Sequence, residues 1–140
     1  MGPPNISAVF DEVKLGFTYT IESLMKKDSL DLTDDDRTII YDAVAEDPAH
    51  RILITHGTDT MVETAKKLSG IQGKTIVLTG ALKPALFKTT DAVFNIGCAV
   101  GALQALQPGV WIAMNGCIWD PGKVRKNRQK NRFESLPEEG

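Results

Sequence analysis

The sequence of 140 residues has the length of one domain, and its 42% hydrophobic and 24% charged residues are typical of globular proteins. Its net charge of −2 conceals an asymmetry, because residues 1–50 carry eleven acidic and four basic side chains whereas residues 51–140 carry seven and twelve. These values exclude a fibrous or wholly disordered chain, and two cysteines with two histidines exclude a disulfide framework and a metal site of the usual ligand spacing.

The first predicted elements lie in the acidic half of the chain. Residues 17–21 alternate between apolar and polar side chains and are rich in β-branched and aromatic types, which predicts a strand. Thr33 precedes three aspartates, which favours a helix N-terminus there. The apolar spacing that follows extends this helix to the region of Pro48.

The second half alternates between apolar strands and amphipathic helices. Three short apolar runs predict buried strands: 51–55, 74–79 and 110–114. The segments between them predict two helices, one from Thr60 to Gly70 and one that Asp91 caps and that ends at Pro108. Strands with two apolar faces, separated by helices, predict an α/β fold: a three-layer α/β/α sandwich around a mostly parallel, doubly wound sheet.

We expect one α/β domain over residues 1–132 and a frayed acidic tail over residues 133–140. Residues 123–132 contain six basic side chains in ten, a density that can hold phosphate groups. Because no aromatic residue interrupts this run, a solvated loop is the favoured interpretation. No apolar run approaches the roughly 18 residues that span a bilayer, and the N-terminal residues lack the features of a signal peptide. The expected location is therefore the cytoplasm, with no membrane and no nucleic acid as partners.

In a parallel sheet, ligands bind outside the carboxyl ends of the strands. Three polar segments fall at that edge: 55–60, 79–84 with 89–91 behind it, and 120–126. In the first, Gly57 permits a tight turn, and Thr58 presents a hydroxyl beside the Asp59 carboxylate at a helix N-terminus. These residues alone favour a helix-capping pair, with a hydroxyl activated by a nearby base as the alternative. His56 is interpreted as a structural residue bonded to the turn.

Residues 54–64, ITHGTDTMVET, resemble the second signature of the bacterial-type L-asparaginase family, the threonine-dependent asparaginases and glutaminases. Further segments are similar to family motifs in the same order: 27–34, 77–84, 91–95, 114–115 and 124–126. The resemblance extends over residues 25–130 and favours the activated hydroxyl over the capping pair.

This resemblance implies a catalytic triad in which Thr58 supplies the hydroxyl, Lys126 the paired amine and Asp59 the carboxylate. It implies hydrolysis of the side-chain amide of asparagine, with glutamine as a further possible substrate, and no metal or organic cofactor. Members of the family are dimers or tetramers, so a homo-oligomer is expected.

The resemblance also implies how the substrate is held. Ser29 would bind the α-carboxylate and Asp59 the α-amino group, with Gly57 in the same site and the carbonyl of Ala81 facing the leaving amide nitrogen. Leu30 stands where the family usually has a polar residue.

The family's first motif, TGGTI, has no counterpart here. The expectation is therefore an N-terminally incomplete asparaginase-type domain, or a protein that has lost hydrolysis. Two functions stay open: an amidohydrolase, and a non-catalytic amino-acid-binding or assembly domain that retains the fold. Binding of nucleic acid through residues 123–132 is a distant third.

Overall fold

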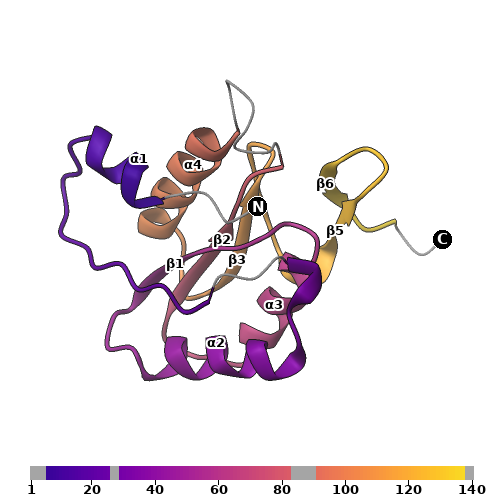
Figure 1. The fold of residues 1–140 in the computed structure, drawn as a ribbon, viewed down its shortest axis with the longest axis horizontal. Helices are drawn as coiled ribbons and strands as arrows, with labels where there is room; N and C mark the ends of the chain where they lie inside the picture. Colours follow the sequence, from indigo (N-terminus) through magenta and orange to yellow (C-terminus); the bar gives the residue numbers. More distant parts are fainter. Residues whose placement is uncertain (1–5, 26–28, 83–90, 138–140) are drawn as a thin grey trace.

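The structure is a computed structural model that describes residues 6–25, 29–82 and 91–137 (Figure 1). Its elements follow in this order: α1 (Ile6–Glu12), η1 (Ser29–Asp31), α2 (Asp34–Glu46), β1 (Arg51–Thr55), α3 (Met61–Leu68), β2 (Thr75–Thr79), α4 (Ala92–Ala105), β3 (Gly109–Met114), β4 (Cys117–Trp119), η2 (Pro121–Lys123), β5 (Val124–Asn127) and β6 (Arg132–Ser135). No helix among these described residues is both long and apolar enough to cross a membrane.

A four-stranded sheet in the order β1-β2-β3-β4 forms the centre of the fold, with helices on both faces (Figure 1). Strands β1, β2 and β3 are parallel, and β4 is antiparallel to β3. On β2, Ile76 and Leu78 pack in the cluster that contains α2 and α3, whereas Val77 packs against α4 on the other face. The predicted α/β sandwich with a mostly parallel sheet is confirmed, because strands buried on both faces need a helix layer on each side.

The two crossovers within the sheet differ in hand. The chain moves in one direction across the sheet, from β1 to β2 and from β2 to β3. The connecting helices α3 and α4 nevertheless lie on opposite faces. Two such crossovers must have opposite hands, so one of them is the left-handed form that is rare in parallel sheets.

The predicted helix after Thr33 is confirmed as α2, and its cap explains where it begins. The Thr33 side chain accepts a hydrogen bond from the backbone N–H of Asp36, and the Asp36 side chain accepts one from the backbone N–H of Thr33. This reciprocal pair satisfies two backbone donors that the first helical turn leaves without partners.

The strand predicted over residues 17–21 is wrong. The segment is irregular in the structure and has no strand partner among the described residues. Its aromatic side chains instead form edge-on contacts: the ring centroid of Tyr19 lies 4.9 Å from that of Phe10 and 6.4 Å from that of Phe17. An alternating pattern describes only side-chain types, and a strand also needs a neighbouring edge with which to pair.

Residues 132–135 form strand β6 rather than the beginning of a frayed tail. Strand β6 pairs antiparallel with β5, so most of the basic run belongs to a two-stranded hairpin and not to a loop. Phe133 is buried in the main core cluster, which holds the hairpin against the domain. The acidic composition of this region concealed the effect of one large apolar side chain, whose burial stabilises the strand.

The sequence analysis did not predict β4, which follows β3 through a two-residue turn. The turn consists of Asn115 and Gly116, both with positive φ, at 56° and 72°. Asn-Gly is the pair that most favours this type of hairpin turn. The Asn115 side chain also accepts a hydrogen bond from the backbone N–H of Phe133, at 2.8 Å, which ties β6 to the turn.

Candidate active site

The turn between β1 and α3 carries three of the predicted site residues, Gly57, Thr58 and Asp59. It begins where the backbone N–H of His56 donates to the carbonyl of Thr79 at the end of β2, at 2.9 Å. At Gly57 the loop of Ser29 comes so close that an added Cβ would lie 2.5 Å from the Ser29 Cβ. Glycine is therefore required at position 57 for the two loops to meet.

Lys126 reaches the same turn from strand β5. Side chains alternate between the two faces of a strand, and the buried Val124 lies two residues before Lys126. Lys126 accordingly points inward, and its side chain is only 10% exposed. Because Val124 packs in the core, Lys126 on the same face of β5 is directed toward the turn after β1.

The three residues of the expected triad meet. The Nζ of Lys126 donates to the Thr58 Oγ1 at 2.7 Å and to the Asp59 Oδ1 at 2.6 Å. Thr58 is buried, and the side chain of Asp59 is 32% exposed. A charge-assisted contact of this length fixes the lysine within reach of both oxygens. The arrangement can move a proton between a hydroxyl and an amine beside a carboxylate.

A hollow of about 300 Å³ opens next to this group. Six described residues line it: Ser29, Leu30, Asp31, Gly57, Thr58 and Asp59. The expected substrate residues Ser29, Gly57 and Asp59 therefore line the same pocket, Ser29 from the η1 side and the other two from the turn after β1, but Ala81 is not among the lining residues. Leu30 is 61% exposed, so an apolar side chain faces solvent at the mouth of the site.

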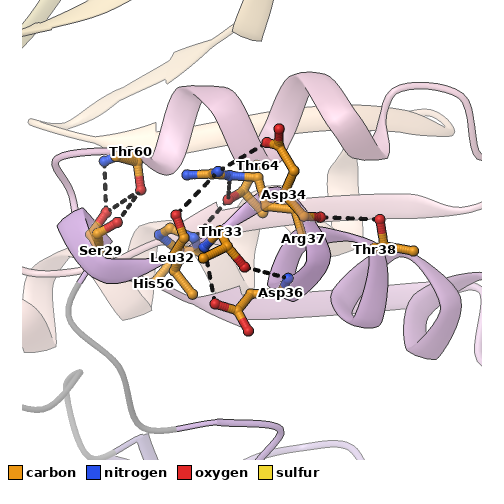
Figure 2. A network of polar contacts seen from close by, with 10 residues as sticks. All are labelled: Ser29, Leu32, Thr33, Asp34, Asp36, Arg37, Thr38, His56, Thr60 and Thr64. Carbon is orange, nitrogen blue, oxygen red and sulfur yellow. Dashed lines mark hydrogen bonds and ion pairs between the residues drawn. The ribbon is translucent and has the colours of Figure 1, made fainter.

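Ser29 is held by Thr60, as Figure 2 shows. The backbone N–H of Thr60 donates to the Ser29 Oγ at 2.6 Å, and the Thr60 hydroxyl donates to the Ser29 carbonyl at 2.7 Å. The two hydroxyl oxygens lie 2.6 Å apart. The Ser29 hydroxyl is thus bonded within the protein, and the η1 loop is fastened to the start of α3.

His56 is buried directly before the site and is bonded at both ring nitrogens. Its Nδ1 lies 2.6 Å from the Gly57 carbonyl and its Nε2 lies 2.8 Å from the Thr64 hydroxyl. Burial is the main cause that lowers the pKa of His56 below its ordinary value of 6.5. These contacts agree with the predicted structural role.

Ala81 lies in the turn after β2. Side chains at the start of α4 form hydrogen bonds with this turn. The Nδ2 of the buried Asn95 donates to the Gly80 carbonyl at 2.8 Å and to the Asp91 Oδ2 at 3.0 Å. The same Asp91 oxygen accepts from the backbone N–H of Leu82 at 2.9 Å. The Asp91 side chain makes no capping bond to α4, contrary to its predicted role, because its carboxylate is turned toward this turn.

Part of the expected second segment lies outside the described residues, namely 83–84 and 89–90, together with 27–28 of the Ser29 motif. Two residues that the sequence analysis did not assign also belong to the surroundings of the site, Thr60 and Thr64. Both stand within ITHGTDTMVET, so their position in that motif was the available signal.

The three arginines of the hairpin lie within ion-pair distance of acidic side chains. Arg125 and Arg132 pair with Glu134, at 3.1 and 3.9 Å. The Nε of Arg128 lies 3.8 Å from the Asp59 Oδ1, which Lys126 also contacts. Over the described ranges, no group of three or more histidine, cysteine, aspartate or glutamate side chains could hold a metal ion.

The comparisons with known proteins agree on one family. A family model described as the N-terminal domain of asparaginase matches residues 3–138. The chain is 34% identical over 110 residues to a glutaminase-asparaginase of Acinetobacter glutaminasificans, covering 75% of this chain and 32% of that protein. It is 42% identical over 102 residues to one component of the glutamyl-tRNA(Gln) amidotransferase of Methanococcus vannielii, covering 65% and 24%.

Among solved structures, the thermostable L-asparaginase from Thermococcus kodakarensis is similar with a TM-score of 0.82 and 28% identity, covering 94% of this chain and 42% of that one. The chain thus spans about a quarter to a third of the length of these curated relatives. Since the family model covers nearly the whole sequence and the structure has the matching α/β fold, the chain belongs to the asparaginase family and corresponds to its N-terminal domain.

Proposed function

We propose that this domain hydrolyses the side-chain amide of asparagine to aspartate and ammonia, with Thr58, Asp59 and Lys126 as its catalytic residues. The observation that carries the proposal is the position of Lys126. Lys126 follows Thr58 by 68 residues in the sequence, and its Nζ nevertheless lies 2.7 Å from the Thr58 hydroxyl, which lines the pocket. Such nucleophile-to-base contacts are characteristic of activated hydroxyl groups.

The proposed chemistry needs one proton relay. A hydroxyl, either that of Thr58 or that of a water bonded to it, attacks the amide carbon, and its proton passes to the amine of Lys126. The lysine then returns that proton to the amide nitrogen as the carbon–nitrogen bond breaks, releasing ammonia. If Thr58 is the nucleophile, water hydrolyses the resulting ester to aspartate and restores the hydroxyl. The carbonyl of Ala81 would accept a hydrogen bond from the departing nitrogen.

An α-amino acid is a zwitterion, and the pocket has groups for both charges. Asp59 uses its Oδ1 for Lys126, so its Oδ2 is the oxygen we assign to the substrate's ammonium group. Ser29 would hold the α-carboxylate once its hydroxyl hydrogen turns from Thr60 to the ligand, while the N–H of Thr60 stays bonded to it. The narrow turn at Gly57 lets the substrate lie against backbone at the pocket floor.

The activities after which the relatives are named support an amide substrate. One is a glutaminase-asparaginase and another is a component of an amidotransferase. We propose asparagine first and glutamine as a second substrate of this chain. Self-association is also proposed: in the described sheet β1 and β4 are edge strands, and unpaired edges favour pairing with another chain. Sedimentation at tens of micromolar would reveal a homo-oligomer, and a stable monomer would contradict it.

The second candidate function is binding of an amino acid without hydrolysis. It is favoured by Leu30, whose exposed apolar side chain replaces a polar contact at the pocket mouth and leaves the substrate held on fewer sides. This function requires Asp59 and Ser29 but not the proton relay.

Release of ammonia from asparagine by the purified chain, at micromolar protein concentration, tests the proposal. We expect release by the parent protein and none by Thr58→Val, which replaces a hydroxyl by a methyl of similar size. Thr38→Val is the matched control, because Thr38 is exposed on α2 away from the pocket. Equal ammonia release by the parent chain and by Thr58→Val would overturn the assignment of Thr58. Saturable aspartate binding without ammonia release would favour the second function.

A further inference from the structure

A line of hydrogen bonds runs from helix α2 to the turn that carries Thr58, as Figure 2 shows in part. The Nε of Arg37 donates to the Thr64 hydroxyl at 3.2 Å, and Thr64 lies 2.8 Å from the His56 Nε2. The other ring nitrogen of His56 lies 2.6 Å from the Gly57 carbonyl. The Arg37 side chain is only 11% exposed, and Thr64 is fully buried. Four residues from three elements are therefore linked out of solvent.

Donor and acceptor chemistry gives this line a direction. A carbonyl only accepts, so the Nδ1 of His56 must carry a proton and donate it to Gly57. A guanidinium only donates, so the Thr64 oxygen accepts from Arg37. Burial, and to a smaller extent the charge of Arg37, lower the pKa of His56 and favour the neutral ring, although the hydrogen bond to the Gly57 carbonyl and the charge of Glu63 act in the opposite direction. The Nε2 of a neutral ring is then an acceptor, and Thr64 donates to it.

The direction depends on the middle residue. The single hydroxyl of Thr64 both accepts from Arg37 and donates to His56, and Thr64 sits on α3, between the histidine and the arginine. A neutral His56 with its proton on Nδ1 is the form that can hold the Gly57 carbonyl. With the proton on Nε2, the Nδ1 lone pair would face the carbonyl oxygen and repel it.

Arg37 also contacts the segment next to η1, on the Ser29 side of the pocket. Its Nη1 donates to the Leu32 carbonyl at 3.5 Å, directly after the η1 loop that contains Ser29. The Ser29–Thr60 bonds fasten the two walls at the pocket, and Arg37 fastens them from behind. Arg37, which lies outside the pocket, therefore links the segments that carry Ser29 and Asp59, the two ends of the proposed zwitterion site.

We propose that Arg37 is a positioning residue: through Thr64 and His56 it fixes the Gly57 carbonyl, and thereby the turn that presents Thr58 and Asp59. Its catalytic consequence rests on the proposed hydrolysis, whereas its structural consequence does not. Displacement of reacting groups by about 1 Å can cost roughly a hundredfold in rate. A loosened turn is therefore expected to lower kcat more than it raises KM.

The test uses the full chain and two pairs of variants. Thr64→Val removes the hydroxyl that relays the line, and Thr64→Ser retains it. Arg37→Met removes the outer donor, and Arg51→Met is its matched control, because Arg51 is exposed at the opposite end of β1. A long-range proton–nitrogen NMR spectrum reports which ring nitrogen carries the proton, and His50, which is exposed, provides an internal reference.

In the parent chain we expect a neutral His56 ring protonated at Nδ1. Thr64→Val and Arg37→Met should mix the two tautomers and shift the amide signals of residues 57–59. They should also lower kcat for ammonia release roughly tenfold or more. Thr64→Ser and Arg51→Met should resemble the parent.

The proposal is overturned if the His56 tautomer and the signals of residues 57–59 are the same in both disrupting variants as in the parent. Loss of these features in Thr64→Ser would overturn it too, because the hydroxyl would then not be the relevant group. If Thr64→Val does not fold, Arg37→Met decides the question alone. A parent chain that releases no ammonia refutes the proposed hydrolysis, while the spectra still decide the role of Arg37.

Discussion

The turn after β1 and the β5–β6 hairpin form one candidate site, but they are held in place by different forces. The turn is fixed by buried polar contacts, from His56 to the Gly57 carbonyl and from Thr60 to Ser29. The hairpin is attached mainly through two buried apolar side chains, Val124 and Phe133, and apart from the inward-pointing Lys126 its charged residues lie toward the surface. Half of the site thus depends on hydrogen-bond geometry and half on hydrophobic burial.

This difference teaches which changes should affect which half. Hydrogen bonds are directional, so loss of one buried partner alters the shape of the turn. Hydrophobic burial is not directional, so loss of an anchor loosens the whole hairpin and removes Lys126 from the turn. The predictions that follow act on one half and leave the other unchanged.

The largest expected effect comes from the apolar anchor. Phe133→Ala should lower the free energy of unfolding by about 3–5 kcal/mol, because it empties a buried aromatic site. Phe94→Ala is the control, since Phe94 is 61% exposed and its loss should change stability by less than about 0.5 kcal/mol. Urea unfolding of both variants measures this. Similar losses in both would show that Phe133 does not anchor the hairpin.

The next effect separates binding from chemistry within the site. Asp59→Ala should weaken aspartate binding tenfold or more, corresponding to the loss of a charge-assisted hydrogen bond worth about 1.5–3 kcal/mol. Lys126→Met should leave aspartate binding close to that of the parent chain, because it removes a neighbour and not the contact. Calorimetric titration distinguishes them, with Asp42→Ala as an exposed control on α2. Unchanged binding by Asp59→Ala would refute the assignment.

We expect a smaller effect of pH on stability, through the turn after β1 and its buried polar contacts. The folded chain has a lowered pKa at His56, so below about pH 6.5 the unfolded chain binds a proton there that the folded chain does not. Stability should therefore fall as the pH decreases from 6.5 toward the folded pKa, and this contribution should be constant above 6.5. His56→Gln should flatten the slope. A slope in His56→Gln equal to that of the parent chain would contradict the burial of His56.

The smallest effect concerns the charged surface of the hairpin. A hydrogen bond from Asn127, and then the neighbouring Arg125, lower the pKa of Glu134. Its contribution is present at neutral pH and is lost as the pH falls through the lowered pKa. Because such exposed pairs contribute little, Glu134→Gln should alter stability far less than Phe133→Ala does. A comparable loss in urea unfolding would mean that charge, and not burial, holds the hairpin.

The parallel strands of the central sheet could be predicted because local patterns determine them. Apolar runs, a capping threonine and helical periodicity identified β1, β2, β3, α2 and α3 within one or two residues. The first pocket wall was accessible for the same reason, since Gly57, Thr58 and Asp59 are consecutive and lie at a strand end. Residues that are neighbours in sequence need no long-range information to be placed together.

The remaining features depend on contacts between distant residues. The alternation of residues 17–21 could not reveal that no described strand lies beside them. The acidic surroundings of Phe133 concealed a core residue. Arg37 gave no local signal at all, because its partner Thr64 is 27 residues away. Lys126 was identified only through the family resemblance, since its distance from Thr58 is a result of tertiary packing.

The central claim is that Thr58 and Lys126, brought together from the two halves, act as one unit. A double-mutant cycle on asparagine hydrolysis tests this most directly, with Thr58→Val, Lys126→Met and the combined variant compared by kcat/KM. Groups that act together lose their function together, so we predict that each single variant is as inactive as the double variant. Independent losses that multiply in the double variant would contradict the claim.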